Sequence, residues 1–128
     1  MPAAQSSTLP RYPGSAELAV DGNRDGNYNA GDPCFHTNKD TNPWWRVDLG
    51  FSRPIDQVVI FNRMDSPWNR LDGFNVYVGD NEIIQENPLC AANQPVQTKK
   101  SNYTISCYGL MGRYVGILIP RKEYLHLC

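Results

Sequence analysis

The sequence has little net charge, no long apolar run and no pair of cysteines spaced for zinc. Lys and Arg number 12 and Asp and Glu 13, so the net charge is −1 and no basic field exists for nucleic acid or an anionic membrane. The longest apolar runs, VVIF and VGILI, are much too short to cross a bilayer. MPAAQSS lacks the features of a signal peptide, so we expect Met1 to be an initiator before a mature domain.

A sustained 3.6-residue apolar period is also missing, which argues against a helical domain. Gly and Pro contribute 10 residues each, and short β-rich runs alternate with turn residues. Strands are expected at 44–50, 55–63, 73–80, 101–107, 112–120 and 123–128. We therefore predict an all-β antiparallel sandwich that forms a single domain over residues 1–128.

The four cysteines form no CxxC pair and allow three disulfide pairings. We favour Cys90–Cys107, which closes a local loop, together with Cys34–Cys128, which ties the end of the chain to its first third. Disulfides indicate an oxidising compartment, so a secreted protein is expected. The NYT sequon at Asn102 agrees with that expectation.

The segment AVDGNRDGNYNAGDPC at 19–34 is too rich in Asp, Asn and Gly to form regular structure. Long loops of this kind in a compact domain usually carry function. Asp21, Asn23 and Asp25 alternate, but the final Glu and the flanking helices of an EF-hand are missing. Two readings stay open: a calcium ion held by carbonyls and one or two of these side chains, or a metal-free loop of Asx turns.

The segment RMDSPWNR at 63–70 places Arg63 and Arg70 on either side of Asp65, directly after a predicted strand. Both arginines could face one mouth of the sandwich, with Asp65 orienting one guanidinium. Trp68 and Tyr28 are candidates for an apolar wall beside them. Such a combination suits a neutral polyol, whose hydroxyls accept hydrogen bonds and whose C–H face packs on rings. Two solvated surface arginines are the simpler alternative.

No catalytic arrangement stands out. His36 could join a Ser-His-Asp triad, but the sequence contains no GxSxG nucleophile elbow. The cysteines are expected to be paired, and no pair of carboxylates typical of glycoside hydrolysis can be recognised. No enzymatic activity is expected.

The residues resemble a known family. AVDGN at 19–23 followed by WWRVDLG at 44–50 is similar to the discoidin, or coagulation-factor C-type, jelly roll. Within that superfamily, the F-type lectins (fucolectins) share a motif: a His, then 26 residues, then Arg-x-Asp, then four residues, then an Arg or Lys. This sequence matches the motif over 35 residues. The matching residues are His36, Arg63, Asp65 and Arg70. The resemblance covers essentially the whole chain and implies an antiparallel jelly-roll sandwich.

The resemblance also implies a site. His36, Arg63 and Arg70 would donate hydrogen bonds to the hydroxyls and ring oxygen of L-fucose, with Asp65 behind them. A structural calcium ion would be held by loop carbonyls and side chains at Leu18, Asp21, Asn23, Pro33 and Cys128. The family's bridge from the cysteine near the histidine to the carboxy-terminal cysteine supports the pairing of Cys34 with Cys128.

Three departures from the family pattern stand out. Many fucolectins carry two adjacent cysteines after Arg-x-Asp, whose disulfide packs on the sugar; here Ser66 and Pro67 stand there, so Pro67 or Trp68 is expected to replace that contact. The family continues past its last cysteine with an acidic calcium ligand, whereas this sequence stops at Cys128 and is expected to lack part of the last strand. The wall for the fucose methyl group lies in variable loops, where Tyr28 and Leu9 are candidates.

The leading hypothesis is a calcium-stabilised, non-catalytic lectin domain that binds terminal L-fucose on glycans outside the cell, in glycan or microbe recognition as part of innate immunity. The alternative is a discoidin-type adhesion module that binds phospholipid or a protein partner through exposed hydrophobic residues. Free L-fucose would compete only with the first. A homo-oligomer or a place in a multidomain chain is compatible with both.

Overall fold

The computed structural model describes residues 3–7, 35–37, 39–61, 71–96 and 102–127. The described chain is nearly all β, and every pair of strands is antiparallel, as predicted. The one helix whose bounds lie within the described residues is the short 3-10 helix η3 (Ile84–Glu86). The strands are β1 (Ala3–Gln5), β2 (Phe35–His36), β3 (Asp40–Thr41), β4 (Trp44–Phe61), β5 (Phe74–Gly79), β6 (Leu89–Gln94), β7 (Asn102–Leu118), β8 (Lys122–Glu123) and β9 (His126–Leu127).

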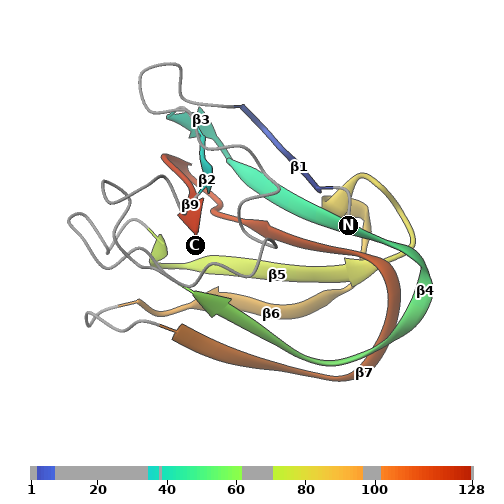
Figure 1. The fold of residues 1–128 in the computed structure, drawn as a ribbon. Helices are drawn as coiled ribbons and strands as arrows, with labels where there is room; N and C mark the ends of the chain where they lie inside the picture. The colour runs from blue at the N-terminus through green and yellow to red at the C-terminus, as the bar shows by residue number, and fades with distance from the viewer. Residues whose placement is uncertain (1–2, 8–34, 38, 62–70, 97–101, 128) are drawn as a thin grey trace.

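The main sheet has five strands in the order β1-β4-β7-β5-β6, and two small ladders join β2 to β9 and β3 to β8. Strands β4 and β7 pair from Trp44 opposite Leu118 to Phe61 opposite Asn102. Figure 1 shows both strands curving together through one large bend, so that their two halves lie in different layers. The sandwich is therefore made largely by folding one long strand pair over on itself.

Two of the expected strand breaks are wrong for a common reason. Residues 44–50 and 55–63 were expected as separate strands, but β4 continues through Gly50, whose φ is 89°. Similarly, β7 continues through Tyr108 and Gly109, with φ values of 53° and 78°, where a break between 107 and 112 was expected. Register shifts accompany both places, and such bulges let a strand bend without ending.

The remaining observed strands differ less from the strands expected from the sequence. The expected strand at 73–80 is confirmed as β5. The expected strand at 123–128 is replaced by the short pieces β8 and β9. Strand β6 was not predicted, because LCAANQ contains no β-branched or aromatic residue.

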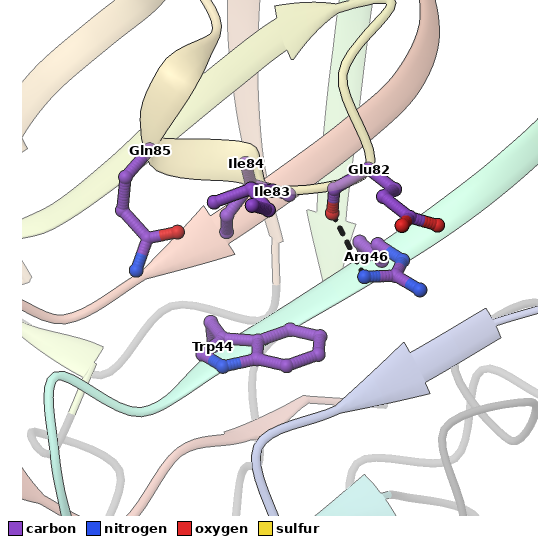
Figure 2. Close-up of a pocket in the computed structure, with 6 residues that line it drawn as sticks. All are labelled: Trp44, Arg46, Glu82, Ile83, Ile84 and Gln85. Carbon is purple, nitrogen blue, oxygen red and sulfur yellow. Dashed lines mark hydrogen bonds between the residues drawn. The ribbon is translucent and has the colours of Figure 1, made fainter.

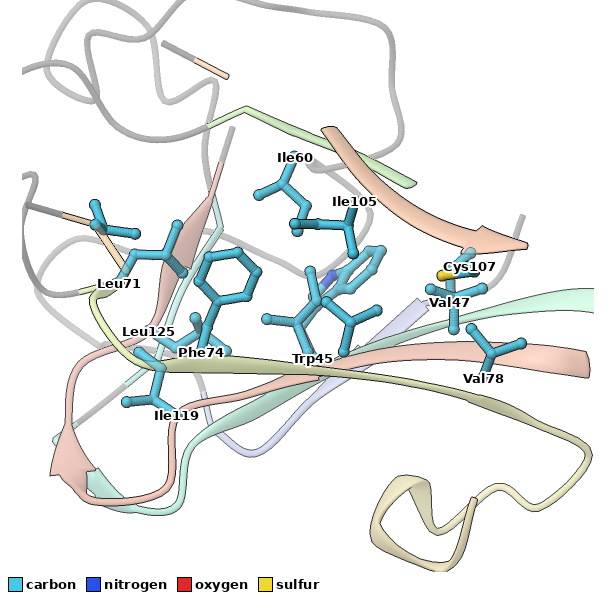
Figure 3. Packing of buried hydrophobic residues seen from close by; sticks show 14 residues of the cluster. Trp45, Val47, Ile60, Leu71, Phe74, Val78, Ile105, Cys107, Ile119 and Leu125 are labelled. Carbon is cyan, nitrogen blue, oxygen red and sulfur yellow. The ribbon is translucent and has the colours of Figure 1, made fainter. Parts of the chain in front are cut away.

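The hydrophobic core lies between the two layers (Figure 3). Trp45 and Val47 of β4 are buried, as are alternate residues of β5 and the last four residues of β7. Each fully buried aliphatic or aromatic side chain contributes about 1.5–3 kcal/mol relative to an exposed one. The buried members from the neighbouring strands are Phe74, Val76, Val78, Val115 and Ile117.

The loop that contains η3 packs on the outer face of the main sheet. Ile84 is only 2% exposed although it lies in this surface loop. It reaches the sheet because position 116 is glycine: a Cβ atom on Gly116 would lie 2.5 Å from Cγ2 of Ile84. Any side chain at position 116 would push Ile84 and its loop away from the sheet.

The predicted disulfide between Cys90 and Cys107 is confirmed. It joins β6 to β7 and closes a loop with a sequence separation of 17 residues. Loop-closure entropy assigns a bridge of this size about 3 kcal/mol of stabilisation. Cys34 and Cys128 lie outside the described residues, so their pairing stays a prediction. No helix in the described part of the chain is long and apolar enough to span a membrane.

Candidate functional site

Most residues of the predicted site lie outside the described part of the chain. For His36 the structure describes the backbone, as the second residue of β2, but not the side chain. What the structure does describe is the frame that holds the two site segments. The predicted residues outside it are Leu9, Leu18, Asp21, Asn23, Tyr28, Pro33, Cys34, Arg63, Asp65, Ser66, Pro67, Trp68, Arg70 and Cys128.

The segment 62–70, which contains both arginines, is anchored at its two ends. On one side, β4 stays paired up to Phe61, whose partner is Asn102. On the other side, Leu71 is buried, with 1% of its surface exposed. The side chain of the next residue, Asp72, accepts a hydrogen bond of 2.7 Å from the backbone N–H of Val96. Arg63 and Arg70 therefore each lie within two residues of a fixed point of the sandwich.

The strand that contains His36 is held by the end of the chain. Phe35 pairs with Leu127 and His36 with His126. The next residue, Thr37, is fully buried, and its N–H donates to the carbonyl of Leu125 at 2.9 Å. Its hydroxyl oxygen accepts a 2.9 Å hydrogen bond from the N–H of Leu125. Because a buried hydroxyl without a partner would be costly, this exchange fixes the backbone next to His36.

Arg121 connects these elements. Its guanidinium donates to the backbone carbonyl of Asp72, just after the arginine segment, and also lies 3.8 Å from the carboxylate of Glu123 in β8. Its own carbonyl accepts a 3.0 Å hydrogen bond from the N–H of Asn42, beside β3. In Figure 1 the end of β4, the start of β5 and the β2–β9 ladder lie at the same end of the sandwich, on the left.

Sequence reasoning did not identify Thr37 or Arg121 as supports of this site. Arg121 meets Asp72 across 49 positions of the chain, and no local pattern signals such a contact. Thr37 adjoins the predicted His36, but its burial depends on strand β9 at the far end of the sequence. Both residues hold neighbouring segments in place, since their side chains form hydrogen bonds with backbone atoms of those segments.

An aromatic pair of a buried ring, Phe74, and a partly buried ring, Tyr103, lies at the same end. The rings of Phe74 and Tyr103 meet edge to face, with 6.3 Å between their centres. Burial raises the pKa of Tyr103, and the nearby carboxylate of Asp72 raises it further. The Tyr103 hydroxyl therefore stays protonated at neutral pH. No group of three His, Cys, Asp or Glu residues suited to a metal ion occurs within the described residues, and the predicted calcium ligands lie outside them.

An ion pair lies where β4 and β7 begin their bend. Arg113 donates from Nε and from one terminal nitrogen to the two carboxylate oxygens of Asp48, at 2.8 and 2.9 Å. The hydrogen bond from Arg113 lowers the pKa of Asp48, and the N–H of Gly50 lowers it further. The same contact raises the pKa of Arg113. Both shifts favour the charged form of each partner.

The model of an F5/F8 type C family, described as the NedA-like, galactose-binding domain, matches residues 18–117. Among curated relatives, fucolectin-6 of Anguilla japonica is 40% identical over 88% of this chain and 60% of its own length. Fucolectin-1 of the same species is 38% identical over 98% of this chain and 73% of its own length.

Solved structures agree. A fucolectin from the serum of striped bass, Morone saxatilis, superimposes with a TM-score of 0.89 at 37% identity, and the match covers 99% of this chain and 43% of that one. The lectin domain of lectinolysin, solved with Lewis B antigen, gives 0.84 at 31% identity, covering 98% of this chain and 86% of that one. This chain therefore spans less than two thirds of some of its relatives.

The antiparallel sandwich and the family match together define a discoidin-like domain of the F5/F8 type C class. Within that class, the chain belongs to the fucolectins, the F-type lectin family. Membership of a family of lectins confirms the expectation that the domain is not an enzyme.

The Asp48–Arg113 pair predicts a pH-dependent contribution to stability. Because the pKa of Asp48 is lowered in the folded state, its stabilisation is present above the unfolded pKa, near pH 4, and is lost as the pH falls through the folded pKa. The free energies of urea unfolding of wild type and Asp48→Asn should therefore differ at neutral pH and converge as the pH falls below the folded pKa of Asp48. Asp56→Asn, an exposed change on the same strand, is the control. A difference that stays constant over this range would contradict the assignment.

Proposed function

We propose that this chain is a lectin domain that binds terminal L-fucose on glycans through His36, Arg63 and Arg70, with Asp65 orienting an arginine. The function rests on membership of the fucolectins. The lectin domain of lectinolysin, whose structure was solved in complex with Lewis B antigen, has the same fold. The residue roles rest on the complete match of the four motif positions. Trp68 and Tyr28 are proposed as the apolar wall of the same pocket.

The proposal rests on one observation, which is that the described residues next to the site segments lie at the same end of the sandwich. The backbone of His36, the last paired residue before Arg63 and the buried residue after Arg70 belong to elements at one end of the sandwich. Arg121 and Thr37 connect these elements by hydrogen bonds. This arrangement of the neighbouring described residues supports the proposal that two segments far apart in sequence contribute to one small ligand.

The segment from residue 18 to residue 33, together with Cys128, is proposed to hold a structural calcium ion. The chemistry of the donor set fits a hard cation, because carbonyls of Leu18, Pro33 and Cys128 and side-chain oxygens of Asp21 and Asn23 are all oxygen donors. Calcium would cross-link the loop at 19–34 to the chain end, and so support the strand that contains His36.

A second bridge, Cys34–Cys128, is proposed at this point. Its support is the register of β2 and β9, since Phe35 directly follows Cys34 and pairs with Leu127, which directly precedes Cys128. Together with Cys90–Cys107 it favours an oxidising, extracellular location. Recognition of microbial or host glycans in innate immunity fits that location. Oligomer formation and membership of a longer multidomain chain stay predictions.

The adhesion-module alternative is less well supported. Large hydrophobic side chains such as Phe51 and Met111 are exposed, but family membership favours a lectin. Liposome binding that free L-fucose does not reduce would favour the alternative.

Removing either arginine is expected to weaken L-fucose binding sharply. A hydrogen bond to a charged group is worth about 1.5–3 kcal/mol, so Arg63→Ala and Arg70→Ala should each lower affinity by about ten- to hundredfold. Monosaccharide affinities fall roughly between micromolar and millimolar, so such a loss abolishes measurable binding. Titration calorimetry with L-fucose is the measurement. Arg53→Ala, which removes an arginine on the bend, is the control. Wild-type affinity in both variants would refute the site assignment.

Removing calcium is expected to lower stability and, through it, sugar binding. A ligand that binds only the folded state raises apparent stability by about 2.7 kcal/mol at 100 times its Kd, so chelation should lower the melting temperature by several degrees. Magnesium at the same concentration is the control, because it prefers a smaller, octahedral site. Identical melting curves in calcium and in chelator would contradict the metal site.

The disulfide assignment predicts two bridged peptides in the natural protein. Peptide mapping without reduction should recover Cys34 linked to Cys128 and Cys90 linked to Cys107. Reduced thiols at Cys34 and Cys128 would contradict both the pairing and the oxidising location, whereas a Cys34–Cys90 peptide would contradict the pairing alone.

A further inference from the structure

A second concave surface lies on the outer face of the main sheet. Trp45, with 5% of its surface exposed, and Val47 face the core, so Trp44, Arg46 and Asp48 project from the opposite face of β4. The loop of η3 covers part of this face because Ile84 packs on Gly116. Figure 2 shows Trp44 on one side of the resulting cavity, and Ile83, Ile84 and Gln85 on the other.

Two cavities lie next to each other on this face, and both are lined by Arg46 and Glu82. The larger measures about 220 Å³, and its other lining residues are Trp44, Ile83, Ile84 and Gln85. The smaller measures about 140 Å³, and its other lining residues are Ala3, Ala4, Asp48 and Tyr114. We refer to the two together as the outer groove. From Trp44 to Asp48 it follows β4 for about 13 Å at roughly 3.3 Å per residue, enough for more than one sugar ring.

Arg46 is held in place between the two cavities. Its Cζ lies 5.4 Å from the centre of the Trp44 ring and 5.8 Å from that of Tyr114. One terminal nitrogen donates a 2.8 Å hydrogen bond to the backbone carbonyl of Glu82. Within the described part of the chain this is its one hydrogen bond, so further N–H donors of the guanidinium are available to a ligand in the two cavities that Arg46 lines. The side chain is positioned before any ligand arrives, which reduces the entropic cost of binding.

The groove combines the groups that bind neutral carbohydrate. The Trp44 ring and the Ile83 side chain offer apolar surface for the C–H face of a pyranose. Arg46 supplies donors, the Glu82 carboxylate supplies acceptors, and the Gln85 amide supplies both, as adjacent hydroxyls require. Arg46 and Glu82 balance in charge, and Arg113 already neutralises Asp48. The groove therefore has no excess positive charge to attract an anionic ligand. A neutral ligand is favoured, because it leaves these paired charges balanced.

We propose that the outer groove is a second binding site, for a neutral di- or oligosaccharide, with one ring against Trp44 and the next beyond Arg46. None of the residues that line it belongs to the proposed fucose site, so the two sites are independent. A chain with both would contact a branched glycan at two points. Because the second contact then becomes intramolecular, weak affinities at each site would combine into stronger attachment.

The three tryptophans provide separate reporters for a test. Trp44 lies in the outer groove, Trp45 in the core, and Trp68 in the proposed fucose segment. Their indole N–H resonances can be followed by nitrogen–proton correlation NMR and assigned with single Trp→Phe variants. Lactose, cellobiose and chitobiose are the neutral probes. At least one is expected to shift the Trp44 signal with millimolar half-saturation while Trp45 stays still, and L-fucose should shift Trp68 alone.

Matched variants test the role of Arg46. Arg46→Met keeps the packing of the stem but removes the donors, and should weaken the disaccharide response of Trp44 at least tenfold. Arg53→Met is the matched control, because Arg53 also lies over an aromatic ring, Phe51 at 4.2 Å, and donates to one backbone carbonyl. The control should bind as wild type does.

Three results would overturn the proposal. The first is a Trp44 signal that none of the neutral disaccharides moves at concentrations above about 10 mM, ten times a millimolar Kd. The second is equal weakening by Arg46→Met and Arg53→Met, which would show a general effect on the fold. The third is tighter binding of anionic sialyllactose than of lactose. A Trp68 signal that ignores L-fucose would count against the fucose site and leave the test of the outer groove intact.

Discussion

The antiparallel pairing of β4 with β7 is the constraint on which the rest of the structure depends. It extends from Trp44 and Leu118 to Phe61 and Asn102, and both strands bend together between the two layers. Strand β1 adds to the first half of β4, and β5 adds to the second half of β7. The core forms where the two halves face each other, so burial of apolar side chains and hydrogen bonding of the backbone are satisfied by the same bend.

The two proposed binding surfaces follow from this arrangement in different ways. The fucose contacts are assigned to segments between strands, whose ends are anchored by Leu71, Thr37 and Arg121. The outer groove combines a strand face, where alternation places Trp44 and Arg46 on the side away from the core, with the η3 loop, which supplies residues 82–85. Loops vary in sequence more readily than the faces of paired strands. The first surface and the loop side of the outer groove are therefore suited to changes of specificity, whereas the strand side of the outer groove is suited to a constant contact.

The fold class was predictable from the sequence because alternation and turn residues act locally. The strand at 73–80 and the Cys90–Cys107 bridge were identified for the same reason, and a fixed motif spacing identified the family. The bends were not predictable, since glycine and turn residues such as Gly50 and Gly109 read as strand ends unless the partner strand is known. The anchoring by Arg121 and the outer groove depend on residues brought together from distant parts of the chain, which no local pattern reveals.

The two outermost strands of the main sheet have a consequence for the behaviour of the protein at high concentration. Strand β1 has three residues, and β6 pairs with β5 through two register shifts and contains Asn93 at a φ of 52°. A regular row of free N–H and C=O groups is what another copy of a chain needs to extend a sheet. One edge is too short and the other too irregular to offer such a row. Within the described residues, β1 and β6 are thus poor templates for edge-to-edge aggregation because of their backbone geometry, and neither strand contains a charged side chain.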